Sequence, residues 1–276
     1  MSLVGYHTTV HVSDVLADLT AEQDDLDALV GTLSDDDLMR PTASPGWSVA
    51  DQIAHLTYFD RAAAIAIDNP SKFAGMGAEL WDATGSDDVD DVTLGPYRTL
   101  PRTDLVDAWR SNRDALAAAA AGLADDDRVE WYGPSMGSKS FLTARLMECW
   151  AHGQDIALAT NTTRTATDRL VHIARLGFIT RGWSYTNRGL DAPTDAVSVS
   201  LTAPSGAVWN FGDTSATESV SGSAEDFCLV VTQRIHVDDT DLLSTPLARE
   251  WLVIAQAFAG PPTDGPSPRG ATQRAE

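Results

Sequence analysis

Basic residues are scarce in this sequence, which has 19 lysines and arginines against 40 aspartates and glutamates, a formal net charge of −21. A surface of that sign repels phosphate backbones, so we expect no nucleic-acid partner. Cysteine is rare too, because Cys149 and Cys228 are the only two, too few for a disulfide framework. Both lie in apolar helical patterns, where we expect reduced thiols in the core of a cytoplasmic protein.

Long apolar runs are also missing. No stretch approaches the roughly 20 apolar residues that span a bilayer, and the N-terminus lacks the basic and apolar regions of a signal peptide. We therefore expect no membrane partner. We also expect the protein to be either a monomer or a homodimer. The P-loop and GxGxxG motifs are absent, which argues against nucleotide cofactors.

Helical periodicity dominates the first two thirds of the chain. Apolar residues recur at helical spacing, and Ser48 with Asp51 forms a capping box before the second helix. These signals predict a helical bundle over residues 1–160, followed by a connecting helix within 161–192. The segment 69–101 is rich in Gly and Asp and predicts an irregular loop with a short helix near 76–81. The long helices are expected at 12–30, 49–67, 103–121, 138–159 and 167–188.

The pattern changes at Pro193. Apolar and polar residues alternate over 197–202, and a Pro-Ser-Gly turn leads to a returning strand at 207–211, which predicts a β-hairpin. Two further helices are expected, at 224–235 and 247–258. The fold class is therefore mainly α with a C-terminal α+β domain over 193–262. The tail 263–276 is rich in Pro, Gly, Ser and Thr and is predicted to be disordered.

Glu148 and His152 are the first candidate metal ligands. Their spacing of four places both side chains on one helix face, one turn apart, where they can hold a single ion. Asp155 continues that face and can orient His152 by accepting its second ring N–H. Taken alone, the same spacing is more often that of a surface ion pair.

A third ligand has to come from another helix, and His55 is the best candidate. It lies in an apolar stretch, where burying an imidazole without a partner is costly. Two histidines and one carboxylate leave a coordination position open, as in catalytic zinc sites, and the same ligands suit iron(II). Tyr58, on the next turn after His55, is predicted to line the site, with plain packing as the alternative.

Two motifs carry a resemblance to a known family. The segment Trp47–Leu56 resembles the W-[ST]-V-x-x-x-x-x-H-[LI] signature of the DinB-like superfamily. The segment Ala144–Asp155 resembles its second signature, in the form found in mycothiol-dependent maleylpyruvate isomerase and its relatives. This resemblance implies an up-and-down four-helix bundle. It also implies a divalent metal, Zn2+ with Fe2+, Ni2+ or Mn2+ as alternatives, bound by His55, Glu148 and His152.

The resemblance also implies chemistry. In that branch the metal binds the sulfur of mycothiol, the low-molecular-weight thiol of actinobacteria, as a co-substrate, and yields a nucleophilic thiolate. Arg234 is the candidate for a contact with substrate carboxylates. The stretch 222–262 resembles a sister group of the isomerase, which leaves the electrophilic substrate open.

The sequence thus predicts a metal-dependent enzyme, either a mycothiol S-transferase or an isomerase, acting on an electrophilic small molecule. One alternative is a hydrolase or lyase of the same fold that uses metal-bound water. Another is a non-catalytic protein that binds a metal or senses a ligand.

Overall fold

The computed structural model describes residues 10–83 and 89–270. These residues form two compact units, the first ending at Arg164 and the second beginning at Thr165. Within the described ranges, no helix combines the length and apolar character needed to cross a membrane.

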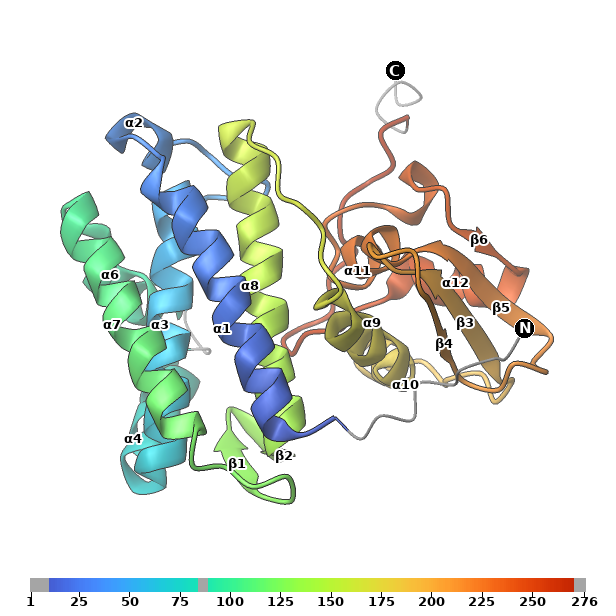
Figure 1. Cartoon of the computed structure of the whole chain (residues 1–276), viewed down its shortest axis with the longest axis horizontal. Coiled ribbons are helices and arrows are strands. Elements are labelled where there is room, and N and C mark those ends of the chain that lie inside the picture. Colours follow the sequence, from blue (N-terminus) through green and yellow to red (C-terminus); the bar gives the residue numbers. More distant parts are fainter. Residues whose placement is uncertain (1–9, 84–88, 271–276) are drawn as a thin grey trace. The chain divides into compact units, whose positions relative to one another are not determined.

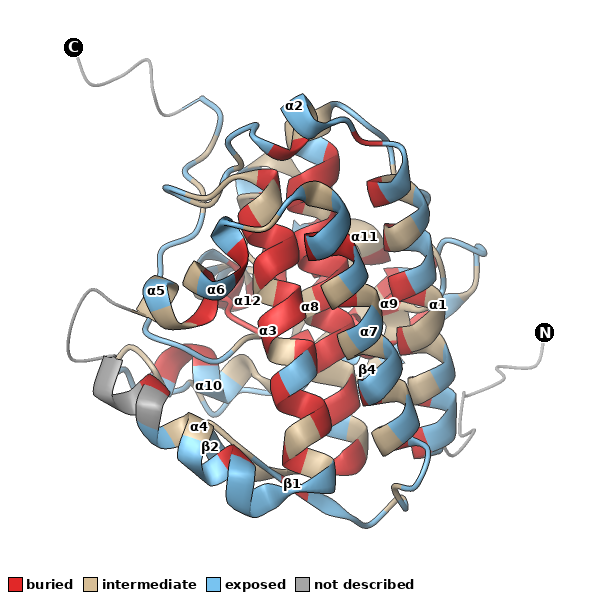
Figure 2. Cartoon of the chain, turned by 90° about the vertical axis from the view of Figure 1, so that its left-hand side faces the viewer, coloured by how far each residue is buried: buried red, intermediate tan, exposed pale blue. Residues whose placement is uncertain are grey.

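Four long helices build the first unit (Figure 1). Helix α3 packs against α7 and α8, and α1 packs against α8 and α7. Buried residues run along the facing sides of these helices (Figure 2), which confirms the predicted bundle. The four are α1 (Val12–Gly31), α3 (Val49–Asp68), α7 (Arg102–Ala120) and α8 (Ser138–Thr160).

The start of α3 is set by the predicted capping box. Ser48 Oγ accepts from the backbone N–H of Asp51 at 3.2 Å, and Asp51 Oδ2 accepts from the N–H of Ser48 at 2.9 Å. Two of the backbone N–H groups that lack an intrahelical partner at the start of α3 are thereby satisfied. This start places His55 in the second turn of α3, on the part of the helix that packs against α8.

Shorter elements connect the long helices. A two-stranded hairpin, which was not predicted from the sequence, leads directly into α8. Helix α4 replaces much of the irregular loop expected over 69–101, because Asn69 Oδ1 accepts from Lys72 N–H at 3.1 Å and Pro70 suits a first turn. These elements are α2 (Asp35–Leu38), α4 (Pro70–Ala83), α5 (Val89–Thr93), α6 (Gly95–Arg98), β1 (Arg128–Trp131) and β2 (Gly133–Gly137).

The second unit contains a four-stranded sheet in the order β4-β3-β5-β6. The predicted hairpin of β3 (Val197–Thr202) and β4 (Val208–Phe211) is present and antiparallel. Strand β5 (Glu218–Ser223) runs parallel to β3 and pairs with β6 (Leu243–Ser244). The sequence did not predict β5, because Val220 is its only large apolar residue and the period-2 signal is therefore weak.

Helices complete the second unit. Helices α9 (Leu170–Ile179) and α11 (Ala224–Val231) pack against each other, and α11 also contacts β3 and β5. Helix α9 belongs to this unit, so the segment expected as a connecting helix over 161–192 contributes to its core. The remaining helical elements are α10 (Arg181–Thr186), η1 (Val237–Asp239) and α12 (Pro246–Ile254).

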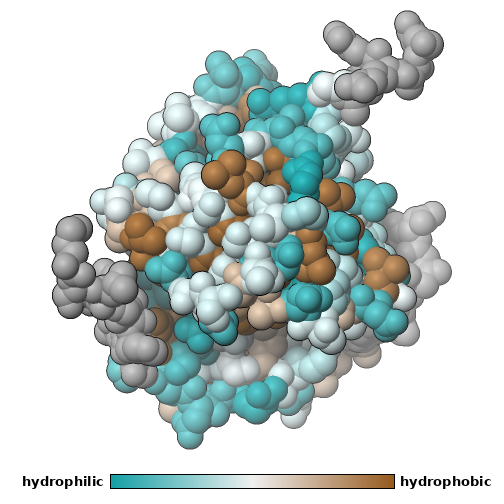
Figure 3. Space-filling model, turned by 90° about the vertical axis from the view of Figure 1, so that its right-hand side faces the viewer, coloured by the Kyte–Doolittle hydropathy of each residue, from teal (hydrophilic) through white to brown (hydrophobic). Residues whose placement is uncertain are grey.

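The second unit ends in an irregular segment and exposes several large apolar side chains. Residues 263–270 contain no helix or strand, whereas 271–276 of the tail predicted to be disordered lie outside the described residues. Figure 3 shows apolar patches among polar residues on one face of the molecule. Single exposed apolar side chains are common on protein surfaces. The exposed large apolar residues of this unit are Ile179, Trp183, Leu190, Val208, Leu243 and Val253.

Candidate metal centre

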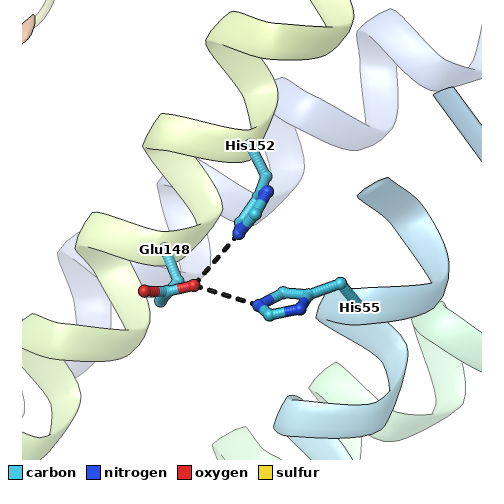
Figure 4. Close-up of side chains that lie close together, drawn as sticks. All are labelled: His55, Glu148 and His152. Atoms are coloured by element: carbon cyan, nitrogen blue, oxygen red, sulfur yellow. Dashed lines mark hydrogen bonds and ion pairs between the residues drawn. The ribbon is translucent and has the colours of Figure 1, made fainter. Parts of the chain in front are cut away.

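The three predicted ligands meet between two helices of the bundle. His55 comes from α3, and Glu148 and His152 come from successive turns of α8 (Figure 4). Nε2 of His55 and Nε2 of His152 each lie 3.1 Å from Oε2 of Glu148. One ligand atom from each residue lies within 4.8 Å of the others, so the three can hold one metal ion.

Burial and charge set the protonation of this group. Burial, together with the neighbouring His152, lowers the pKa of His55 to about 4. Burial opposes ionisation of Glu148, but the hydrogen bonds and charges of His152 and His55 outweigh it and hold the pKa of Glu148 well below its usual value. At neutral pH, His55 is therefore neutral and Glu148 ionised, which are the states that metal binding requires.

A buried amide holds the other side of His152. Nδ1 of His152 is hydrogen-bonded to Oε1 of Gln52, a residue of α3 that is 0% exposed. Asp155, the predicted partner, has Oδ2 3.8 Å from the same nitrogen, beyond hydrogen-bond distance. Gln52 therefore makes the contact that the sequence predicted for Asp155. Its signal in the sequence is an amide within an apolar stretch, one turn before His55.

The ligand atoms of these three residues suit a bound cation. A carbonyl oxygen can only accept, so Nδ1 of His152 carries a hydrogen, and in the neutral ring the lone pair of Nε2 then points toward Glu148. A lone pair and an ionised oxygen 3.1 Å apart repel each other unless a cation or a proton lies with them. Two imidazoles and one carboxylate are a set that zinc and iron(II) both accept.

Aromatic rings flank the imidazoles. The ring centroid of Trp47 lies 5.3 Å from that of His55 and 6.1 Å from that of His152, and the Phe59 centroid lies 4.5 Å from that of His55. Nε1 of Trp47 donates to Asp90 of α5 at 2.9 Å, which holds the indole in place. The two imidazoles therefore sit in a largely apolar setting.

Tyr58 lies in the aromatic cluster beside this site. Its side chain is buried, and its ring centroid is 5.0 Å from that of Phe59. The hydroxyl of Tyr132 donates to the hydroxyl of Tyr58 at 3.4 Å. Burial and this hydrogen bond raise the pKa of Tyr132, so it stays protonated at neutral pH. A role for Tyr58 in binding a cofactor remains a prediction.

A buried ion pair lies one turn before Glu148 on α8. Nη2 of Arg145 is 2.9 Å from Oδ1 of Asp60, and the two side chains are 4% and 3% exposed. Nε2 of Gln23 donates to Asp60 at 3.2 Å. Burial raises the pKa of Asp60, and Arg145 opposes that rise. The pair joins α3 to α8 beside the three ligands.

Arg234 belongs to the second unit. It follows α11, and its Nη1 donates to the backbone oxygen of Thr232 at 2.7 Å. Its predicted contact with a substrate carboxylate remains a prediction.

Comparisons with known proteins agree with this fold. Two uncharacterized proteins of Mycobacterium tuberculosis, from strains CDC 1551 / Oshkosh and H37Rv, are each 43% identical to this chain over 254 residues, covering 91% of it and 97% of the relative. The crystal structure of the mycothiol-dependent maleylpyruvate isomerase matches with a TM-score of 0.59 at 17% identity, covering 88% of this chain and 96% of that one.

A histidine-to-alanine variant of that isomerase matches with a TM-score of 0.57 at 16% identity, covering 84% of this chain and 92% of that one. Likeness at these identities concerns the fold, a helical bundle followed by a small mixed sheet with helices. The family model of the mycothiol maleylpyruvate isomerase N-terminal domain matches residues 19–157, which contain all three candidate ligands. The chain belongs to this mycothiol maleylpyruvate isomerase N-terminal domain family.

Proposed function

We propose that this protein is a divalent-metal-dependent enzyme that activates mycothiol for reaction with an electrophilic small molecule, as an S-transferase or an isomerase. The observation that carries the proposal is the convergence of His55, Glu148 and His152 on one point between α3 and α8. Three protein ligands leave a coordination position for an external group. Membership of a family named after a mycothiol-dependent enzyme supports mycothiol as that group.

The protein's own thiols do not compete for this role. Cys149 and Cys228 are both buried, and burial raises the pKa of each thiol well above its usual value. A thiol in that state is a poor nucleophile. The nucleophilic sulfur therefore has to come from outside the chain, which favours a co-substrate thiol.

The side chains around the site determine its charge. Glu148 contributes one negative charge, and His55 is neutral at pH 7. With a divalent cation bound, the site keeps a net positive charge that favours a thiolate over a thiol. Such a cation, Zn2+ in our proposal with Fe2+, Ni2+ or Mn2+ as alternatives, lowers the pKa of a coordinated thiol and supplies the thiolate at neutral pH.

Trp47 and Phe59 restrict water near the imidazoles. Their rings lie against His55, and Trp47 also lies beside His152. Fewer waters leave the interaction between the site and an incoming sulfur less screened. The same apolar setting suits the carbon skeleton of an electrophilic substrate.

Metal analysis of the purified full chain is the first test. We expect one divalent ion per chain after reconstitution with zinc, and none in His152→Ala. Absence of a bound ion in the wild-type protein would reject the proposal, including its enzyme class.

The cobalt-substituted protein tests the thiol. Titration with mycothiol should produce a sulfur-to-cobalt charge-transfer band, whereas S-methyl mycothiol, which cannot form a thiolate, should not produce it. A cobalt spectrum that mycothiol leaves unchanged would show that the site binds metal without taking this thiol. Water-based chemistry or metal binding alone would then be favoured.

A further inference from the structure

Gln52 is wholly buried on α3, one turn before His55, and its amide group is fully bonded. Nε2 donates to Thr42 Oγ1 at 2.8 Å and to Ser44 Oγ at 3.1 Å. An amide nitrogen has two hydrogens, and both are used in these bonds. The carbonyl oxygen is therefore the atom that faces His152.

The hydroxyl of Thr42 determines the direction of these hydrogen bonds. The hydroxyl of Thr42 donates to the backbone oxygen of Trp47 at 3.0 Å, so Thr42 Oγ1 has to accept from Gln52. Rotation of the amide by half a turn would place an oxygen against Thr42, whose hydrogen is already used, and an N–H against the ring of His152. The backbone that leads into α3 thus determines which atom of Gln52 points at the site.

This arrangement selects one tautomer of His152. The Gln52 oxygen accepts the hydrogen of Nδ1, and the neutral ring then has its lone pair on Nε2, 3.1 Å from Oε2 of Glu148. Nε2 is the atom that a shared cation needs. His152 is therefore prepared for metal binding before any metal arrives.

We propose that Gln52 is a positioning residue, whose neutral amide fixes the tautomer and orientation of His152 and thereby sets the affinity of the site for a divalent cation. This inference rests on the proposed metal site. Outer-shell acceptors of this kind are often carboxylates, and an amide adds no negative charge. A cation held here keeps more of its positive charge for an incoming sulfur.

The affinity test compares Gln52→Leu with Gln23→Leu in the full-length protein. Gln23 is a second buried amide of the same bundle, 3% exposed, and it donates to Asp60 and not to a ligand. Zinc affinity is measured by competition with a chromophoric chelator. Gln52→Leu should weaken zinc binding by about 10–100-fold, and Gln23→Leu should leave it unchanged. Equal affinities for wild type and Gln52→Leu would overturn the proposal.

The tautomer test needs no metal and no variant. In the metal-free, 15N-labelled wild-type protein, at a pH where the ring is neutral, long-range proton–nitrogen correlations should show hydrogen on Nδ1 of His152 and none on Nε2. A hydrogen on Nε2 would overturn the proposal, even if Gln52→Leu failed to fold. Wild-type protein that shows the expected tautomer but binds no zinc would reject the proposed function and leave the role of Gln52 in orienting His152 intact.

Discussion

Nε2 of His55, on α3, lies 3.1 Å from Oε2 of Glu148, on α8, and that same oxygen lies 3.1 Å from Nε2 of His152. One carboxylate oxygen thus links two helices that are far apart in the sequence. The position of Glu148 between the two rings makes it the residue whose charge matters most to a bound cation.

Replacing Glu148 by Gln should remove metal binding while leaving the bundle folded. The substitution keeps the size of the side chain but removes the negative charge that offsets a divalent cation. The loss in zinc affinity should exceed the roughly 10–100-fold that removal of an outer-shell partner costs. Chelator competition measures it, and far-UV circular dichroism checks the helices.

Glu130→Gln is the matched control for that change. Glu130 is exposed on β1, and its replacement removes the same charge elsewhere in the unit. Its zinc affinity should equal that of the wild type. If both variants lost zinc equally, the effect would come from the overall charge of the protein and not from a ligand.

Acid should destabilise the metal-free protein. The pKa of His55 is lowered from 6.5 to about 4 in the folded state, so between these values the unfolded chain binds a proton that the folded chain does not. Stability then rises with pH in that window, is fully present above about pH 6.5, and falls as pH decreases toward 4. The lowered pKa of Glu148 acts in the same direction, below 4.5.

Urea denaturation of the metal-free protein at pH 7 and pH 5 measures this effect. We expect a lower midpoint at pH 5. His55→Phe keeps an aromatic ring at the position but cannot titrate. The difference between the urea midpoints at pH 7 and pH 5 should therefore be smaller in this variant. An unchanged difference in this variant would assign the pH effect to other groups.

The sequence predicted the proximity of the three candidate ligands better than it predicted their surroundings. The spacing of Glu148 and His152 fixes their relative position because an α-helix has a constant number of residues per turn. The capping box at Ser48 fixes the position of His55 on α3. The pairing of α3 with α8 then brings the ligands together. These are local rules, and they predict local geometry well.

The missed features depend on contacts between distant segments. Gln52 bonds to His152, 100 positions away, and neither spacing nor periodicity reports such a contact. Strand β5 is held by pairing with β3 and β6 despite its serine-rich sequence, because tertiary pairing overrides weak strand propensity. Helix α4 was predicted only in part, as a short helix near 76–81, because the Gly and Asp residues of its neighbourhood favour loops in any local analysis.

Breaking the buried ion pair beside the site should cost stability. Arg145→Leu leaves the Asp60 carboxylate buried without its main partner, and loss of one member of such a pair costs about 3–5 kcal/mol. The double variant Arg145→Leu with Asp60→Leu should recover much of that loss, since no charge then remains buried. Denaturant titration of the wild type, the two single variants and the double variant forms the cycle, and equal losses in Arg145→Leu and in the double variant would contradict the prediction.

Gly153 should not tolerate a side chain. A Cβ there would lie 2.6 Å from Nη1 of Arg164. That guanidinium cannot move away freely, because it donates to the backbone oxygen of Trp150 at 3.1 Å and pairs with the buried Glu22 of α1 at 2.5 Å. Gly153→Ala should therefore weaken the contact between α1 and α8 by about 1–3 kcal/mol.

The double variant Gly153→Ala with Arg164→Ala separates this clash from helix propensity. Arg164→Ala alone removes the guanidinium that pairs with the buried Glu22, so it should be destabilised, but adding Gly153→Ala to it should cost nothing more. In that background Gly153→Ala should even add a little stability, because alanine has a higher helix propensity than glycine. If Gly153→Ala destabilised the Arg164→Ala protein as much as the wild type, the conflict at Gly153 would lie with some group other than the guanidinium.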